Sequence, residues 1–252
     1  MRNRTTATLF FVDMLGVRSS WQKDGRKGAE GSFQLFQENI QQALLPLTRA
    51  EILDASIESD SAVFKCRNAE AAVFLALRLF RRTFARGSNI RAERRSWLRG
   101  VIIPISRAAV FRKEQDISRS AVLLKNFVYH RGILDAISIE KSGYRGMRCL
   151  IKSNLITDAL RFKFRFMIGT NELPRFRHLE HSLYPRRIAK EFEDLLWMNP
   201  HDDISQWGKY QVYMANRLRY SGHNPDELSH AAATQIVFHE CEAMIAARRR
   251  RI

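Results

Sequence analysis

Asp13 is the first residue whose type and position suggest chemistry. It follows the apolar run Leu-Phe-Phe-Val at residues 9–12, which is typical of a buried strand. A carboxylate there needs a partner, because an unpaired charge is costly to bury. Leu15, Gly16 and Val17 follow at once and offer backbone N–H groups, and an acid beside such amides suits a metal-bound polyphosphate. The structural alternative is an Asp at a strand end that caps the next turn.

Asp60 is a second acid at a predicted turn. Residues 51–66 show the pattern of two short strands that meet at the sequence Glu-Ser-Asp-Ser, residues 58–61. The aspartate therefore lies at the tip of a predicted hairpin. Asp60 thus adds a second acid on a predicted hairpin to Asp13 on a predicted strand.

The charge of the chain indicates an anionic partner. The formal net charge is +16 and the isoelectric point is about 10.4. Apart from residues 91–99 and 248–251, the arginines are spread along the sequence, and the interleaved aromatic pattern of a single-strand binder is absent. A nucleoside triphosphate is also an anion and would account for part of the positive charge. Nucleic acid is therefore not the favoured partner.

Length and composition predict one domain. With 252 residues and 45% hydrophobic content the chain can bury a large core. Within the one domain we expect an α+β core at residues 1–183 and a helical extension at residues 184–252 that packs on it. Cys66, Cys149 and Cys241 are far apart, so neither a disulfide framework nor a zinc site is indicated. There is no apolar run of membrane-span length and no signal-peptide pattern, which predicts a soluble, cytoplasmic protein.

The elements that must position the two acids follow from the periodicity of the sequence. The expected order is a strand at residues 7–13, a polar loop at 18–31, a helix that stops near Pro46, the hairpin at 51–66, a helix from Asn68 to Gly87, a strand at 96–104 that ends near Pro104, a helix at 117–129, a strand at 134–140, and helices from Pro185 onward. The first part is the βαββαβ order of a ferredoxin-like α+β fold. Its antiparallel sheet has helices on one face, so the other face needs a cover, for which we expect a second subunit.

Three motifs stand in this order along the chain. They are Phe-Val-Asp-Met-Leu-Gly at residues 11–16, Ser-Asp-Ser at 59–61 and Leu-Arg-Gly at 98–100. Motifs and elements together resemble the catalytic domain of the class III nucleotidyl cyclases. The resemblance covers about the first half of the chain and implies that Arg99 contacts a triphosphate, which suits the paired donors of a guanidinium.

The chemistry of such a cyclase explains the two acids. Attack of a ribose 3′ oxygen on the α-phosphorus builds negative charge on the nucleophile and on the leaving pyrophosphate, and two Mn²⁺ or Mg²⁺ ions can stabilise both. Asp13 and Asp60 would bridge the metals, and the Met14 carbonyl could add a ligand. The amides of Leu15, Gly16 and Val17, residues 15–17, could then hold terminal phosphate oxygens.

A further cation should meet the charge on the α-phosphate. In the family it comes from the helix after the third strand, and the sequence at residues 117–126 contains no clean copy of the family motif. Lys125 is our first choice for this role and Arg119 the second. Both also fit the alternative of solvated helix residues.

The choice of base distinguishes this chain from the purine cyclases. In adenylate cyclases a lysine reads the adenine, and counting back from Asp60 puts Ser56 at that place. The motifs and the C-terminal extension are similar to those of the pyrimidine cyclases of bacterial Pycsar antiphage systems. This implies a homodimer that converts UTP to cyclic UMP and pyrophosphate, and a separate effector that the product activates. The alternatives are a cytidylate cyclase that uses CTP, an adenylate cyclase, and a non-catalytic basic protein that binds nucleic acid.

Overall fold

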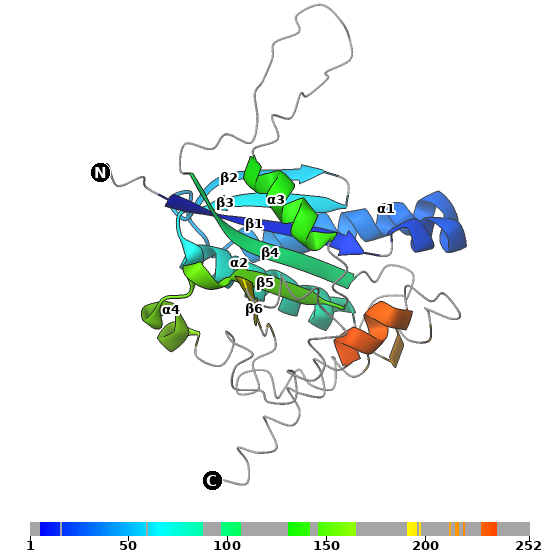
Figure 1. Cartoon of the computed structure of the whole chain (residues 1–252). Helices are drawn as coiled ribbons and strands as arrows, with labels where there is room; N and C mark the ends of the chain where they lie inside the picture. Colours follow the sequence, from blue (N-terminus) through cyan, green and yellow to red (C-terminus); the bar gives the residue numbers. More distant parts are fainter. Residues whose placement is uncertain are drawn as a thin grey trace, which may run out of the picture.

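A six-stranded sheet forms the centre of the molecule (Figure 1). The computed structural model describes residues 6–15, 17–58, 60–87, 97–106, 131–141, 146–164, 191–195, 197, 212, 215–216, 219 and 228–235. The elements are β1 (Thr6–Leu15), α1 (Val17–Leu44), β2 (Ile52–Glu58), β3 (Ser61–Cys66), α2 (Ala69–Gly87), β4 (Trp97–Ser106), α3 (Arg131–Glu140), β5 (Arg148–Lys152), a 3₁₀ turn (Ser153–Leu155), α4 (Asp158–Lys163) and β6 (Phe192–Leu195). Residues 228–235 form a further helical stretch.

The strand order confirms the predicted α+β class. The sheet runs β2-β3-β1-β4-β5-β6, with β4 and β5 parallel and the other neighbours antiparallel. Helix α1 joins β1 to β2 across the intervening β3, and α2 joins β3 to β4 across β1. This is the split arrangement of a ferredoxin-like βαββαβ unit. It places β1, which carries Asp13, between the hairpin that carries Asp60 and the strand that carries Arg99.

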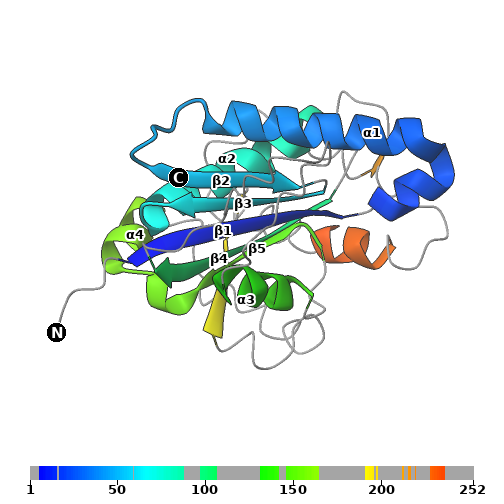
Figure 2. The same ribbon diagram turned by 90° about the horizontal axis from the view of Figure 1, so that it is seen from above.

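The two faces of the sheet have separate cores. Helices α1 and α2 cover one face and α3 lies on the other (Figure 2). Alternate side chains of β1 enter the two cores, as expected for a strand buried on both faces. The core under α1 and α2 includes Phe10, Val12, Met14, Phe36, Ile40, Phe64, Phe80 and Leu98. The core under α3 includes Leu9, Phe11, Val101, Ile103, Ile133, Ala136 and Leu150.

The sequence prediction of a sheet with one uncovered face is therefore wrong in part. Helix α3 packs on β1 and β4 through Ile133 and Ala136, which are 7% and 0% exposed. The cause is the helical character of residues that the sequence analysis assigned to a strand. The segment 134–140 contains two isoleucines, Ile137 and Ile139, which favour a strand by propensity. Gly132, Ile133, Ala136 and Glu140 instead recur at helical spacing and are all buried, so burial decided the structure.

The loop predicted at residues 18–31 is also a helix. Helix α1 begins at Val17, and the glycines that suggested a loop lie inside it. Only Gly25 departs from helical geometry, with φ 64° and ψ −159°, a conformation that is essentially restricted to glycine. Ala29 and Ser32 beyond the kink are buried, so packing outweighs the low helix propensity of the glycines. The predicted end of this helix near Pro46 is confirmed.

The C-terminal part differs from the prediction at one described element. Residues 192–195 were expected to be helical, but they form β6, which pairs antiparallel with β5. The edge of β5 needs a hydrogen-bonding partner, and β6 supplies it. The helical stretch at 228–235 agrees with the predicted helical extension. The helix predicted at 117–129 lies outside the described residues.

Two smaller predictions hold. The side chain of Asn68 caps α2, because its Oδ1 accepts a hydrogen bond from the Ala71 N–H at 2.9 Å. Pro104 lies beyond the pairing of β4 with β5, which ends at Ile102, so on that side Pro104 is at an edge. Within the described parts of the chain, no helix combines the length and apolarity that crossing a bilayer requires.

Residues late in the chain are hydrogen-bonded to the start of β5, a set of contacts that we call the clasp and that involves Trp197, His230 and Thr234. The Gly146 N–H donates to His230 Nδ1 at 3.1 Å, and the Met147 N–H donates to Thr234 Oγ1 at 2.8 Å. Trp197 donates from Nε1 to the Met147 carbonyl at 2.9 Å. Gly146 has φ 89°, and a Cβ there would lie 3.0–3.1 Å from Ala233 and Thr234. Close contact and backbone conformation both require glycine at this position.

Candidate active site

Asp13 lies near the end of β1, between two neighbouring strands. Its register partners are Ser61 on β3 and Arg99 on β4. Since register partners share a face, these side chains lie on the side of the sheet that α3 covers. The full row across five strands is Glu58, Ser61, Asp13, Arg99 and Arg148. The topology thus gathers acids and arginines in one line at one end of the sheet.

Asp60 is held beside Asp13 by the backbone. It lies in the turn between β2 and β3, and its carbonyl accepts a hydrogen bond from the Met14 N–H at 2.7 Å. Ser61 Oγ donates to the Glu58 carbonyl at 3.3 Å within the same turn. The hairpin tip is therefore fixed to the end of β1. The two predicted acids come together, as the sequence analysis required.

The surroundings of Asp13 disfavour its ionised form. Burial, and as a second cause the charge of Asp60, raise the pKa of the Asp13 carboxyl from 3.8 to about 7. The charges of Arg99 and Lys141 act in the opposite direction. Two acids that repel each other at the end of a buried strand form a site that a cation would stabilise.

The donor set fits Mg²⁺ or Mn²⁺. Both ions prefer carboxylate and carbonyl oxygens, and Mg²⁺ keeps several positions for water and substrate phosphate. Within the described ranges there is no group of three or more His, Cys, Asp or Glu side chains that could hold a metal alone. Asp13 and Asp60 would therefore supply part of the coordination, and phosphate oxygens and water the rest.

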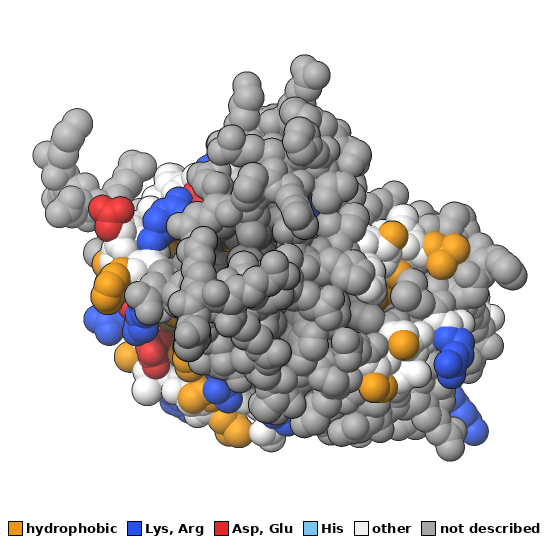
Figure 3. All heavy atoms as spheres, turned by 90° about the horizontal axis from the view of Figure 1, so that it is seen from below, with side chains coloured by type: hydrophobic (Ala, Val, Ile, Leu, Met, Phe, Trp, Pro, Cys, Tyr) orange, Lys and Arg blue, Asp and Glu red, His pale blue; other side chains and the backbone are white. Residues whose placement is uncertain are grey.

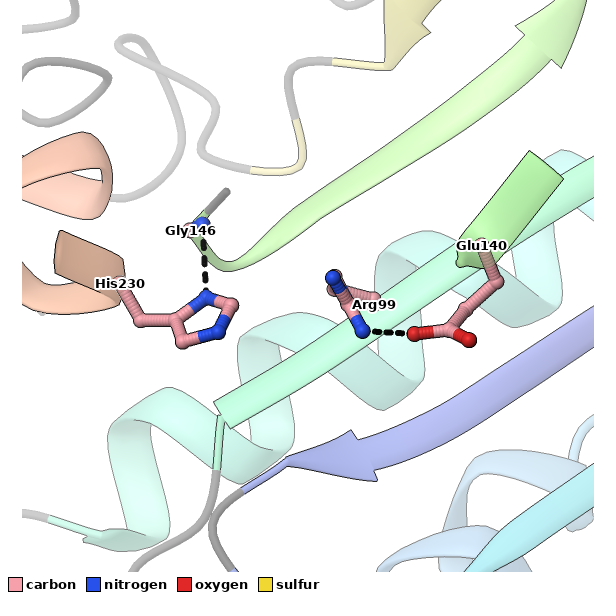
Figure 4. A network of polar contacts seen from close by, with 4 residues as sticks. All are labelled: Arg99, Glu140, Gly146 and His230. Carbon is pink, nitrogen blue, oxygen red and sulfur yellow. Dashed lines mark hydrogen bonds and ion pairs between the residues drawn. The ribbon is translucent and has the colours of Figure 1, made fainter. Parts of the chain in front are cut away.

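Arg99 is half-buried and contacts an acid that the sequence did not single out. Its Nη2 contacts Glu140 Oε1, and the two side chains are 12% and 4% exposed (Figure 4). Glu140 is the last residue of α3, which reaches the site over β1 and β4. Lys141 follows, with its N–H bonded to the Ile137 carbonyl at 2.9 Å. The end of α3 thus adds one acidic side chain, Glu140, and one basic side chain, Lys141, to the site.

Glu140 and Lys141 were missed because their segment was assigned to a strand. Residues 133, 136 and 140 have the spacing of one helix face, and a charged residue at the end of that face was the available signal.

Ser56 has an unusual environment. It lies on β2 opposite Val63, one row away from Asp13 on the same face. It is 5% exposed, and its hydroxyl has no hydrogen-bond partner in the part of the chain that the structure describes. A buried hydroxyl normally has a hydrogen-bond partner. A bound ligand would supply one for Ser56.

The other predicted residues have different outcomes. Leu15 ends β1 opposite Trp97, and Val17 is the first residue of α1, so a helix and not the expected loop begins just after the strand that carries Asp13. The side chain of Met14 is buried in the core on the opposite face. Gly16, Lys125 and Arg119 lie outside the described residues, and their roles stay predictions.

Comparisons with known proteins give a distant likeness among solved structures. No family model matches the chain, and no curated protein matches it. Among solved structures, an adenylate cyclase from Trypanosoma brucei, described in its monomeric state, is similar with a TM-score of 0.42 and 12% identity. The match covers 63% of this chain and 79% of that chain.

Proposed function

We propose that this protein is a cytoplasmic nucleotidyl cyclase that converts a pyrimidine nucleoside triphosphate, preferably UTP, into its 3′,5′-cyclic monophosphate and pyrophosphate. One observation carries the proposal: Asp13 and Asp60 meet at the end of a buried strand, and Arg99 is the register partner of Asp13. Acids alone would repel a triphosphate, so a pair of them beside an arginine indicates that cations mediate the contact. The likeness to class III cyclases in motif order is consistent with this proposal.

Each residue then has a role in the reaction. Two divalent cations, when bound, would lower the pKa of the 3′ hydroxyl and offset the charge of the pyrophosphate. Asp13 and Asp60 hold these cations, and the Met14 carbonyl is a candidate further ligand. Arg99 binds a phosphate oxygen, and the N–H groups of Leu15, Gly16 and Val17 hold terminal phosphate oxygens. Val17 is the first residue of α1, and N–H groups at the start of a helix favour anions.

The preference for a pyrimidine rests on Ser56. A short hydroxyl occupies the place where the adenylate cyclases carry lysine, and it is buried with no partner among the described residues. We propose that it donates or accepts a hydrogen bond at the edge of the base. UTP is favoured over CTP only slightly, because a hydroxyl can serve either edge.

Assembly and biological role extend the same proposal. We propose a homodimer in which Lys125, or else Arg119, of one subunit meets the α-phosphate in the site of its partner. Helix α3 packs on β1 and β4, whereas Val63 on β3 is only partly buried, so the face beside the hairpin is the surface for a second copy. The cyclic product would activate a separate effector in antiphage defence.

The deciding experiment offers all four triphosphates to the purified protein with Mn²⁺ or Mg²⁺. Cyclic UMP as the dominant product supports the proposal, and cyclic CMP supports the nearest alternative. A dominant cyclic AMP product would overturn the proposed pyrimidine preference but would still support a nucleotidyl cyclase. Loss of turnover in Asp13→Ala and Asp60→Ala, with exposed Asp135→Ala as a control on α3, ties the activity to the two acids.

A second candidate is a non-catalytic protein that binds nucleic acid, which the net charge of +16 favours. On the face seen in Figure 3, the Lys and Arg side chains of the described residues are scattered and do not form one continuous patch. Such a protein would bind DNA or RNA in a salt-dependent way and turn over no triphosphate. Asp13→Ala and Asp60→Ala would then bind nucleic acid equally well or better.

A further inference from the structure

The end of α3 joins the candidate site without belonging to any of the motifs. Ile133 and Ala136 anchor the helix on the sheet, and its last residue, Glu140, is 3% exposed. A carboxylate is rarely buried this deeply unless it has a charged partner. Here the partner is Arg99, on the strand next to Asp13. The pair therefore connects the position of a helix to the position of the proposed triphosphate-binding arginine.

An arginine side chain at a binding site has to be fixed before it contributes fully. A long side chain loses rotamer freedom when it is ordered, and that cost reduces binding if it falls at the moment of association. A carboxylate that holds the guanidinium beforehand moves this cost into folding. A guanidinium has five N–H donors, more than one carboxylate contact uses, so it can serve two partners.

We infer that Glu140 is a positioning residue, whose carboxylate holds the guanidinium of Arg99 beside Asp13 in the orientation that receives the triphosphate. The inference rests on the proposed function of the site and adds a residue to it. Glu140 acts through Arg99 and does not touch the nucleotide. The contact also makes α3 part of the site, because a shift of this helix along the sheet would move the arginine.

The opposite role for Glu140 is an inhibitory one, in which it keeps Arg99 from the phosphate. If Glu140 competes with phosphate for Arg99, removing its charge would free the arginine and strengthen binding. Positioning predicts weaker binding. The two roles therefore differ in the sign of one measured quantity.

The test is a double-mutant cycle on nucleotide affinity. The probe is 3′-deoxyuridine triphosphate with Mn²⁺, which lacks the nucleophile and is not turned over, titrated by calorimetry. Glu140→Gln keeps the shape of the side chain and removes its charge. Arg99→Met removes the guanidinium, and the double variant leaves no unpaired charge, so it remains folded if a single variant does not. Thermal unfolding is measured for each protein.

Positioning predicts that Glu140→Gln weakens binding about tenfold in the wild-type background, the lower end of the effect of residues that orient a binding group. In the Arg99→Met background the same change should have no further effect, because the group it orients is gone. A purely structural role would lower thermal stability in both backgrounds without this coupling.

Glu193→Gln is the matched control. Glu193 holds Arg161 at 2.6 Å with 13% of its side chain exposed, in another Arg–Glu pair, which joins β6 to α4. It should change stability without changing affinity for the probe. Equal, additive losses in both Arg99 backgrounds, or tighter binding by Glu140→Gln, would overturn the inference while the proposed function stands. A wild-type protein that binds no 3′-deoxynucleoside triphosphate would overturn the proposed function itself.

Discussion

Met14 donates its backbone N–H to the carbonyl of Asp60 at 2.7 Å, and this hydrogen bond holds the hairpin tip beside the end of the strand that carries Asp13. It joins residues that are 46 positions apart by their numbers, on the central strand and on the hairpin tip. Because the bond is between backbone groups, it does not depend on the charge of either carboxylate. Substitutions at Asp13 and Asp60 can therefore test chemistry with little effect on the backbone that carries them.

The stability of the metal-free protein should fall as pH rises from about 4 to about 7. The pKa of Asp13 is raised to about 7 by burial and by Asp60, whereas in the unfolded chain it returns to about 3.8. Between these values the native state binds more protons than the unfolded state, so the free energy of unfolding decreases by up to about 1.4 kcal/mol per pH unit. Above pH 7 this contribution is constant.

Denaturant unfolding in the presence of a chelator, from pH 4.5 to 8.5, measures this slope. Asp13→Asn should flatten it and be more stable than the wild type at pH 8, while exposed Asp135→Asn should retain the wild-type slope. An unchanged slope in Asp13→Asn would contradict the raised pKa. With Mn²⁺ present, affinity for the ion should increase as pH rises through 7, because the ligand must be deprotonated.

Ser56→Ala should distinguish the effect of the buried hydroxyl on stability from its proposed role in substrate binding. In the unliganded protein the substitution removes a polar group that has no partner among the described residues, so stability should be unchanged or higher by about 1 kcal/mol. With substrate the same change should weaken UTP binding and reduce the preference over ATP. The measurements are thermal unfolding and KM for each triphosphate. Lower stability together with unchanged KM values would assign Ser56 to the fold alone.

Gly146→Ala should destabilise the protein by more than Gly25→Ala. Both glycines have positive φ, so both substitutions introduce backbone strain of about 1–3 kcal/mol. A Cβ at Gly146 would also press on the backbone of residues 233 and 234, while a Cβ at Gly25 meets nothing within 4 Å. Unfolding midpoints in urea give the comparison. Equal losses would mean that the contact with the C-terminal helical stretch can relax.

Mixing Asp60→Ala with Lys125→Ala should restore part of the activity that each variant lacks, if sites form between two subunits. A heterodimer would contain one site with both residues intact. Turnover of UTP against mixing ratio, with light scattering to measure mass, tests this. A monomer with full activity at working concentration would contradict the proposed dimer.

The parts of the fold that the sequence predicted are those where local pattern and tertiary packing agree. The hairpin around Asp60 and the strand of Arg99 have unambiguous apolar patterns bounded by turn residues. Asp13 was selected because a charge in an apolar strand is costly, an argument that does not depend on the fold. Asp60 was selected for its place at the tip of the predicted hairpin.

The parts that it did not predict depend on partners far along the chain. Helix α3 has the composition of a strand, and only the sheet beneath it selects the helical face. Residues 192–195 are a strand because β5 offers an unpaired edge, which no local pattern reveals. Glu140 was missed with α3, since its role depends on a contact with Arg99, 41 residues earlier.

The clasp between Gly146 and His230 has a consequence for how the chain reaches its native state. The two residues are 84 positions apart, and Met147 and Thr234 are 87 apart, so closing these contacts requires ordering a long loop. During synthesis the central strands and their helices are complete long before residues 228–235 leave the ribosome. The start of β5, next to Arg148 and Arg99, therefore acquires its final contacts last. A ribosome-bound chain that ends before residue 228 should show protease-resistant β1 to β4 and a β5 that is still cleaved.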